Sequence, residues 1–144
     1  QVATHYLSKG WQIALFGSAK DQEVTGQIRA VCRDNRDCFD FAGRTELAEA
    51  VDLLSLATAV LSNDSGLMHI ASALRRPVLV VYGATSPAFT PPLSEQSDTV
   101  IPTIDCAPCF ARECPLGHHR CMRETSVDLV VAKLDTLLAQ GPLA

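Results

Sequence analysis

The amino-acid sequence predicts an α/β fold, in which a doubly wound parallel sheet of Rossmann-like type carries helices on both faces. Short apolar segments at 11–16, 59–61 and 78–82 have the length and composition of buried strands. Segments with helical spacing of apolar residues separate them, as in successive strand–helix–strand units. The chain has 144 residues, 47% of them hydrophobic, which is enough to build the core of one domain.

The first elements alternate in the expected way. Residues 3–9 are predicted to be the end of a helix that Gly10 closes, because glycine adopts the left-handed conformation found after helix C-termini. A strand is predicted over 11–16 and a helix over about 22–32. The turn that joins them contains Gly17 and Ser18, and it lies at the carboxyl end of a strand, where open α/β sheets hold ligands.

A short strand with a turn is predicted at 38–43, followed by a helix that opens around Arg44. Thr45 is its expected N-cap, which places Glu49 one residue late for a strict capping box. The apolar face of this helix is predicted to contain Leu47, Ala50, Val51, Leu54 and Ala57.

The central part of the chain reads as one βαβ unit. A strand at 59–61 is followed by the polar turn 63–66, a helix over 66–74 and a second strand at 78–82. Pro77 ends the helix. The apolar positions expected on this helix are Leu67, Ile70, Ala71 and Leu74.

A final helix is predicted from Val127 to about Gln140, capped by Ser126 and ended by Gly141-Pro142. Its apolar stripe, expected to pack on the sheet, contains Val127, Val130, Val131, Leu134, Leu137 and Leu138.

The polar turn of the central unit has the chemistry of a phosphate site. A helix N-terminus presents unpaired N–H groups and partial positive charge, and Gly66 allows a ligand to approach the backbone closely. Ser65 adds a hydroxyl, and His69 lies one turn later on the same face. Asp64 would repel a phosphate, so it suits a helix cap or an acceptor for sugar hydroxyls. The alternative is that Asp64 and Ser65 only cap the helix and His69 is a packed surface residue.

The loop after the strand at 78–82 begins at the same ligand edge. It contains three prolines and several hydroxyls between Gly83 and Leu93, which favours a rigid loop. Thr85 and Ser86 are candidate phosphate or sugar contacts, because functional loops gather at this edge. The alternative is a surface loop that the prolines hold.

Several segments together closely resemble the lipopolysaccharide heptosyltransferases of glycosyltransferase family 9, of the ADP-heptose:LPS heptosyltransferase II type. They are Ser62–Ala71 (SNDSGLMHIA), Arg76-Pro77, 82–87 (YGATSP) and 89–93 (FTPPL). The resemblance extends from the strand at Trp11 to the last helix. Members of this family have two Rossmann-like domains that face a cleft, the GT-B arrangement.

The resemblance implies that residues 1–144 form the single C-terminal domain that binds the nucleotide-sugar donor, and that the N-terminal acceptor domain is absent. The implied donor is ADP-L-glycero-D-manno-heptose and the implied acceptor is the lipopolysaccharide inner core, with no cofactor required. The family places its general base in the absent domain, so we expect this chain to bind ADP or donor weakly without turnover. Rival interpretations are a non-catalytic nucleotide-binding domain and a zinc-dependent interaction module.

The resemblance also assigns residues to the donor. Gly17 and Ser18 would face the nucleotide, with Lys20 and Glu23 within reach of ribose or phosphate, although Ser18 to Asp21 alternatively only cap a helix. The backbone at Arg44 and Thr45 would lie beside the adenine. The remaining donor-binding candidates are Asn63, Asp64, Ser65, Gly66, His69, Thr85 and Ser86. His69 is the candidate catalytic residue, which would stabilise the departing diphosphate.

Four of the six cysteines lie in an insert at about 104–123, at Cys106, Cys109, Cys114 and Cys121. Their spacing leaves zinc binding, disulfides and free thiols open, and no metal ligand is assigned. Members of this family differ in having such an insert, which suggests a local structural staple.

Charge and hydropathy restrict the partners. A net charge of −4 argues against a nucleic-acid surface, and no apolar run is long enough to span a membrane. Six cysteines without a signal peptide lead us to expect a reduced, cytoplasmic protein. The implied acceptor leaves room for peripheral contact with the inner face of the cytoplasmic membrane.

Overall fold

The computed structural model describes residues 1–33 and 35–140. It is an α/β fold in which every pair of hydrogen-bonded strands is parallel, as predicted. The chain divides into two compact units, residues 1–52 (unit 1) and 53–144 (unit 2). The described strands form two hydrogen-bonded sheets, one in each unit. The assignment of residues 1–144 to one donor-binding domain stays a prediction.

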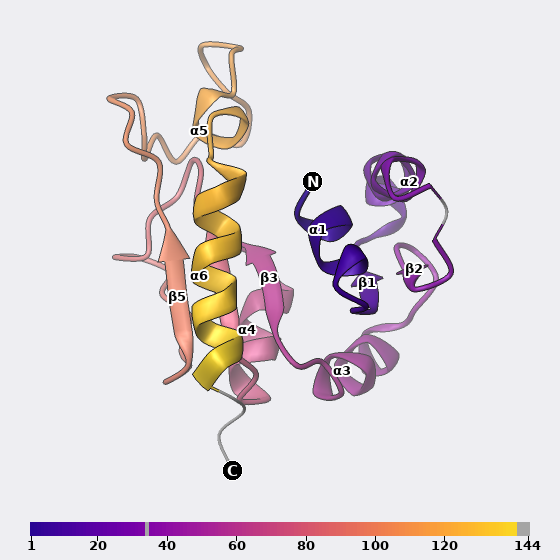
Figure 1. Ribbon diagram of the computed structural model, residues 1–144. Coiled ribbons are helices and arrows are strands. Elements are labelled where there is room, and N and C mark those ends of the chain that lie inside the picture. The colour runs from indigo at the N-terminus through magenta and orange to yellow at the C-terminus, as the bar shows by residue number, and fades with distance from the viewer. Residues whose placement is uncertain (34, 141–144) are drawn as a thin grey trace. The chain divides into compact units, whose positions relative to one another are not determined.

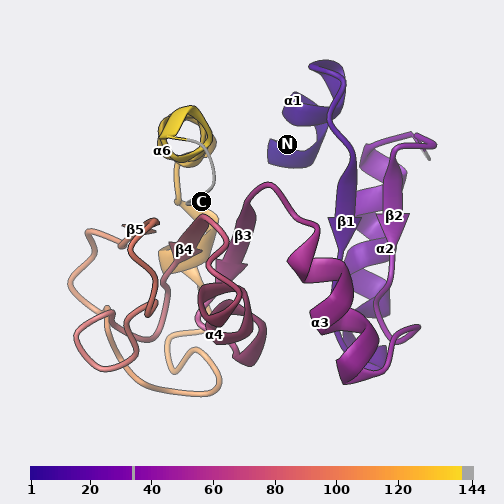
Figure 2. The same ribbon diagram turned by 90° about the horizontal axis from the view of Figure 1, so that it is seen from below.

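Unit 1 contains a two-stranded sheet with helices packed on it. Its elements are α1 (Val2–Ser8), β1 (Ile13–Leu15), the 3-10 helix η1 (Ala19–Asp21), α2 (Gln22–Val31) and β2 (Cys38–Asp40). β1 pairs with β2, α1 packs on β1, and α2 packs on β2 (Figure 2). Gly10 has a φ of +81°, so it closes α1 in the left-handed conformation as predicted.

Helix α3 (Leu47–Ser55) contains the boundary between the units and begins one residue later than predicted. The backbone N–H of Glu46 donates to Glu49 Oε2 over 2.8 Å, which places Glu49 at the third helical position. The prediction that Thr45 is the N-cap was therefore wrong. Ala50 and Leu54 are buried as expected, but Leu47 is 65% exposed and does not belong to the buried face.

Unit 2 contains a three-stranded sheet in the order β3-β4-β5, with α4 and α6 on opposite faces (Figures 1 and 2). Its elements are β3 (Val60–Asn63), α4 (Gly66–Ala73), β4 (Val78–Val81), β5 (Ser97–Val100), α5 (Arg120–Arg123) and α6 (Val127–Gln140). The sequence analysis placed no element at β5 or α5. β3 also continues two residues beyond the predicted end at Leu61, because it pairs with β4 as far as Asn63.

The core of unit 2 lies between α4 and β4. Met68 and Ala71 pack against Val78, Val80 and Tyr82, and all five are fully buried. Residues expected to be on the apolar face of α4 are only half-buried, namely Leu67, Ile70 and Leu74. The helix therefore turns Met68, Ala71 and Ser72 toward the core. Ser72 tolerates this burial because its hydroxyl donates to the Met68 carbonyl over 2.9 Å.

Pro77 was predicted to end α4, and Ser126 was predicted to cap α6. α4 ends at Ala73, and Arg75 takes a left-handed φ of +55° before Pro77, which is fully buried. At α6 the predicted cap is confirmed, because the Leu129 N–H donates to Ser126 Oγ over 3.3 Å. α6 buries Val130, Leu134 and Leu137 of the predicted stripe. Gly141-Pro142 lies outside the described residues.

Candidate functional site

The turn from β3 to α4 consists of Asp64 and Ser65. Ser65 occupies the N-cap position with an extended backbone, at φ −154° and ψ 166°, and α4 begins at Gly66. Asn63 ends β3, where its side chain is exposed and its carbonyl accepts a hydrogen bond from Ser62 Oγ over 2.8 Å. The strand end, the turn and the first helical turn thus stand next to one another, as the sequence predicted.

The prediction that Asp64 and Ser65 cap α4 through their side chains was wrong. Ser65 Oγ lies 3.2 Å from Ser62 Oγ and makes no cap bond within the described helix. The Asp64 carboxylate instead accepts a hydrogen bond from Thr90 Oγ1 over 2.7 Å. The Met68 N–H donates to the Ser65 carbonyl over 3.1 Å. Since neither side chain caps the helix, the N–H groups of Gly66 and Leu67, with the partial positive charge of the helix N-terminus, are left to an anion.

His69 lies on α4 one turn after Ser65, and its side chain is exposed. Residues four apart share a helix face, so the imidazole stands on the same side as the Ser65 hydroxyl. His69 is thus a surface residue, and its contact with a diphosphate stays a prediction. A ring N–H of His69 is thus accessible as a donor to an oxyanion near this face.

A chain of hydrogen bonds ties Asp64 to the loop after β4, and sequence reasoning missed its central member, Thr90. The Tyr82 hydroxyl donates to the Thr90 carbonyl over 2.6 Å, and Thr90 Oγ1 donates to Asp64 Oδ2. Burial raises the pKa of Tyr82, and the negative charge of Asp64 raises it further. Tyr82 therefore keeps its proton and its hydrogen bond well beyond neutral pH.

Thr85 and Ser86 lie half-buried in the same loop. The Ser86 carbonyl accepts backbone hydrogen bonds from Phe89 and Thr90, over 3.0 and 3.2 Å, and Ser86 Oγ accepts the Ala88 N–H over 3.3 Å. These bonds hold the loop, so the prolines alone do not account for its shape. Contact of Thr85 or Ser86 with a donor stays a prediction.

In unit 1, the turn after β1 uses its polar side chains locally. Ser18 is the N-cap of η1, and both its N–H and its Oγ donate to Asp21 Oδ2 over 2.7 Å. These two hydrogen bonds lower the pKa of Asp21. Ser18 Oγ also accepts the Lys20 N–H over 3.3 Å. The capping alternative for Ser18 is thus confirmed, while its contact with a nucleotide stays a prediction.

Two glycines of unit 1 pack this turn against the segment after β2. The Gly43 N–H donates to the Gly17 carbonyl over 2.9 Å, and Gly43 has a φ of +63°. A Cβ at Gly43 would lie 2.7 Å from Ala19 Cα, and one at Gly17 would lie 2.7 Å from Asp21 Cβ. Only glycine permits this approach at both positions. Sequence reasoning selected Gly17 but missed Gly43.

The structure thereby brings Arg44 and Thr45 beside Gly17 and Ser18 within unit 1. Arg44 is exposed, and the half-buried Thr45 makes a long hydrogen bond of 3.5 Å to the Phe41 carbonyl. The side chains of Lys20 and Glu23 are exposed, on η1 and on the first turn of α2. The remaining predicted site residues belong to unit 2, so each unit holds its own group of candidates.

The cysteine-rich insert packs against the segment that follows β4 in unit 2. The Phe110 N–H donates to the Ala84 carbonyl over 2.7 Å, and a Cβ at Gly83 would lie 2.7 Å from Met122 Sδ. The four cysteines of the insert are free thiols. Backbone N–H groups, that of His119 first, lower the pKa of Cys114. In the described part of the chain, no three Cys, His, Asp or Glu residues are grouped to hold a metal ion.

Comparison with known proteins relates the chain to one family. Residues 1–120 match the sequence profile of glycosyltransferase family 9 (heptosyltransferase). The chain is 42% identical to lipooligosaccharide heptosyltransferase 2 of Haemophilus influenzae and 36% identical to lipopolysaccharide heptosyltransferase 2 of Escherichia coli. Each alignment covers 97% of this chain and 41% of the relative. The chain thus spans about two fifths of the relatives' length.

Solved structures agree with the fold. The structure of E. coli ADP-heptose LPS heptosyltransferase II matches with a TM-score of 0.83 at 36% identity, over 96% of this chain and 40% of that one. The glycosyl transferase family 9 structure from Veillonella parvula matches with a TM-score of 0.80 over the same shares. Its 19% identity makes it evidence for the fold alone.

Proposed function

Because the chain belongs to glycosyltransferase family 9, the heptosyltransferases, we propose that it is the donor-binding part of a longer enzyme. That enzyme transfers heptose from ADP-L-glycero-D-manno-heptose to the lipopolysaccharide inner core, and ADP leaves. No cofactor is required in this proposal, and ADP or ADP-heptose is the ligand. The relatives are heptosyltransferases, which supports the sugar class, and the geometry of the β3–α4 turn supports the proposed place of the diphosphate.

The observation that carries the proposal is the open N-terminus of α4. In the proposed complex the donor diphosphate accepts hydrogen bonds from the backbone N–H groups at Ser65 and Gly66 and from the Ser65 hydroxyl. Such donors are already in place before the sugar–phosphate bond breaks, so they stabilise the charge that develops on the leaving ADP. His69, exposed on the same helical face, donates to the same diphosphate.

In the proposal, Asp64 binds the heptose and not the diphosphate. One carboxylate oxygen, Oδ2, is held by the Thr90 hydroxyl at 2.7 Å. The other oxygen, Oδ1, is left to accept a hydrogen bond from a hydroxyl of the heptose. A carboxylate that binds sugar hydroxyls next to the diphosphate site explains why an acidic residue precedes an anion-binding helix.

The nucleotide is assigned to unit 1 in this proposal. The turn at Gly17 and Ser18 faces the ribose, Lys20 and Glu23 reach ribose or phosphate, and the backbone of Arg44 and Thr45 lies beside the adenine. Support comes from the contact that Gly43 makes with Gly17, which gathers both segments at one place in the unit.

The acceptor and the general base belong, in this proposal, to the part of the longer enzyme that lies outside these 144 residues. The chain by itself is therefore expected to bind ADP without transferring sugar. We place the enzyme in the cytoplasm, with peripheral contact at the inner membrane where its acceptor is found. Within residues 1–33 and 35–140, no helix combines the length and apolarity needed to cross a membrane.

Isothermal titration calorimetry of the chain with ADP, GDP and UDP tests the proposal. We expect measurable binding of ADP, weaker binding of GDP and UDP, and a loss of affinity of about tenfold in His69→Asn, equivalent to about 1.4 kcal/mol. His119→Asn is the matched control, because it removes an exposed imidazole outside the site. Asparagine tolerates the left-handed φ of +52° at that position. Equal affinities for the three nucleotides, or equal losses in the two variants, would contradict the proposal.

A further inference from the structure

Helix α5 of unit 2 places two sulfur-containing side chains against Gly83, where the loop after β4 begins. A Cβ built on Gly83 would lie 2.7 Å from Met122 Sδ and 3.7 Å from Cys121 Sγ. The first distance is too short for two packed atoms, so the thioether rests directly on the backbone of this buried glycine. Only the absence of a side chain at Gly83 leaves room for Met122.

The two methionines of the chain differ in their access to solvent. Met122 is 46% exposed, whereas Met68 is fully buried in the core between α4 and β4. A thioether has no proton to lose before it reacts with a peroxide, so accessibility decides which of the two sulfurs is oxidised. Met122 is therefore expected to react and Met68 to be protected.

We propose that Met122 is an oxidation site, and that its sulfoxide loosens the contact between the insert and the loop 83–93. A lone pair of Met122 Sδ attacks one oxygen of hydrogen peroxide, the S–O bond forms and the O–O bond breaks. The leaving hydroxide takes up the proton of the transferred oxygen and becomes water. The sulfur loses two electrons and the peroxide gains them, so thioether and hydrogen peroxide give sulfoxide and water.

The sulfoxide does not suit the packing that the thioether makes. Oxidation turns a flexible apolar side chain into a polar, chiral one. Because a Cβ on Gly83 would already overlap Met122 Sδ, the glycine side holds no space for the added oxygen. Water is the better environment for the polar S–O group, which favours moving the side chain away from the apolar contact. Oxidation is thus expected to separate α5 from Gly83.

The Met122 contact adjoins a second attachment of the insert to the same loop. The Phe110 N–H donates to the Ala84 carbonyl, the residue after Gly83, over 2.7 Å. Further along the loop, Thr90 Oγ1 donates to Asp64 Oδ2 over 2.7 Å. Loss of the Met122 contact therefore weakens the attachment of a loop that reaches the β3–α4 turn. A lower affinity for ADP-heptose after oxidation rests on the proposed function, whereas the loosened loop does not.

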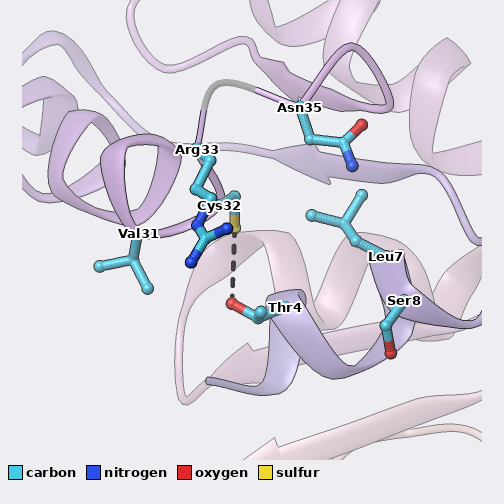
Figure 3. A pocket seen from close by; sticks show the side chains of 7 residues that line it. All are labelled: Thr4, Leu7, Ser8, Val31, Cys32, Arg33 and Asn35. Carbon is cyan, nitrogen blue, oxygen red and sulfur yellow. Dashed lines mark hydrogen bonds between the residues drawn. The ribbon is translucent and has the colours of Figure 1, made fainter.

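Oxidation of the chain with hydrogen peroxide, stopped with catalase, tests the chemistry. Thiols compete for the reagent, because Cys109 is exposed and Cys32 lines a cavity of about 350 Å³ together with Thr4 and Val31 (Figure 3). Mild treatment with dithiothreitol then returns disulfides and sulfenic acids to thiols, whereas the sulfoxide needs its own reductases and stays.

Mass spectrometry after digestion at glutamate locates the added oxygen. Peptide 114–124 contains Met122, and peptide 50–95 contains Met68. We expect the first peptide to become heavier by one oxygen and the second to keep its mass. N-acetylmethionine amide, added to the same sample, shows that the peroxide is active.

Amide hydrogen exchange measures the structural consequence in the chain oxidised at Met122. We expect exchange to become about tenfold faster at the hydrogen-bonded N–H groups of Phe89 and Thr90 in the loop and of Phe110 in the insert. The N–H of Ile13, which donates to the Asp37 carbonyl in unit 1, is the internal control and should exchange as before.

Two variants separate the methionine from the cysteines, with circular dichroism to confirm folding. Met122→Leu keeps the apolar volume and all six cysteines, so its loop should exchange as in the wild type before and after peroxide. Met122→Gln places a polar group on Gly83 and should speed exchange without peroxide.

Four results would overturn the proposal. Met122 could stay unmodified while N-acetylmethionine amide is oxidised, or Met68 could react as fast as Met122. The loop of the chain oxidised at Met122 could exchange as slowly as that of the reduced chain. Equal acceleration in peroxide-treated Met122→Leu would assign the effect to the cysteines.

Discussion

Replacing Gly66 by alanine should separate folding from ligand binding at the start of α4. Gly66 is the first residue of the helix, its φ is not positive, and a Cβ built on it meets no atom within 4 Å. Alanine therefore fits without strain, and it lowers the conformational entropy of the unfolded chain. The expected effect on folding is a gain of about 0.5–1 kcal/mol in the free energy of unfolding.

The same methyl group should weaken ADP binding. It stands where the proposed diphosphate must approach the first-turn N–H groups, and displacing the phosphate costs at least one charge-assisted hydrogen bond, about 1.5–3 kcal/mol. This corresponds to a loss of affinity of roughly tenfold to more than a hundredfold. Urea unfolding followed by circular dichroism measures the first effect, and calorimetry with ADP measures the second.

Gly26→Ala provides the matched control. Gly26 lies inside α2, and a Cβ on it also meets no atom within 4 Å, so this variant should gain a similar stability. Because it lies outside the proposed site, its affinity for ADP should not change. If Gly66→Ala binds ADP as tightly as Gly26→Ala does, the diphosphate does not approach the α4 N-terminus and the reasoning fails.

Two further predictions concern the chain of hydrogen bonds from Tyr82 through Thr90 to Asp64. Thr90→Val keeps the shape of the side chain but removes the donor to Asp64 Oδ2 at 2.7 Å, so ADP-heptose affinity in calorimetry should fall about tenfold while ADP affinity changes little. An equal loss for both ligands would show that Thr90 acts only on the loop. Tyr82 has a raised pKa in the folded state, so its contribution to stability is complete below its unfolded pKa of about 10 and is lost as the pH rises beyond it. Tyr82→Phe should remove this alkaline part of the stability profile in urea titrations, and an unchanged profile would contradict the assignment.

Elements with strong periodicity were predicted well from the residues. The apolar stripe of α6 and its Ser126 cap, the buried β4 and the start of α4 at Gly66 all follow from local patterns that need no partner to be recognised. The candidate phosphate-binding turn was found in the same way, because it lies between a strand and a helix that are both clear in the sequence.

The sequence analysis missed β5 because its residues form a strand only through contacts with the rest of unit 2. Ser97 to Val100 is short and mostly polar, so it resembles a loop. In the fold, both Asp98 carboxylate oxygens accept hydrogen bonds from Lys133 Nζ on α6, over 2.8 and 2.7 Å. An ion pair between residues 35 positions apart leaves no local signal.

The order of residues along the chain was sufficient to identify the parallel α/β class, the β3–α4 turn and the family resemblance, since each depends on short-range pattern. The hydrogen-bond partners of individual side chains could not be predicted from short-range pattern. Asp64 has the residue type of a helix cap, yet the approach of Thr90 from a loop 26 positions away makes it an acceptor for that hydroxyl. Long-range packing decided this competition, because a hydrogen-bonding group with several possible partners pairs with whichever the fold brings within reach.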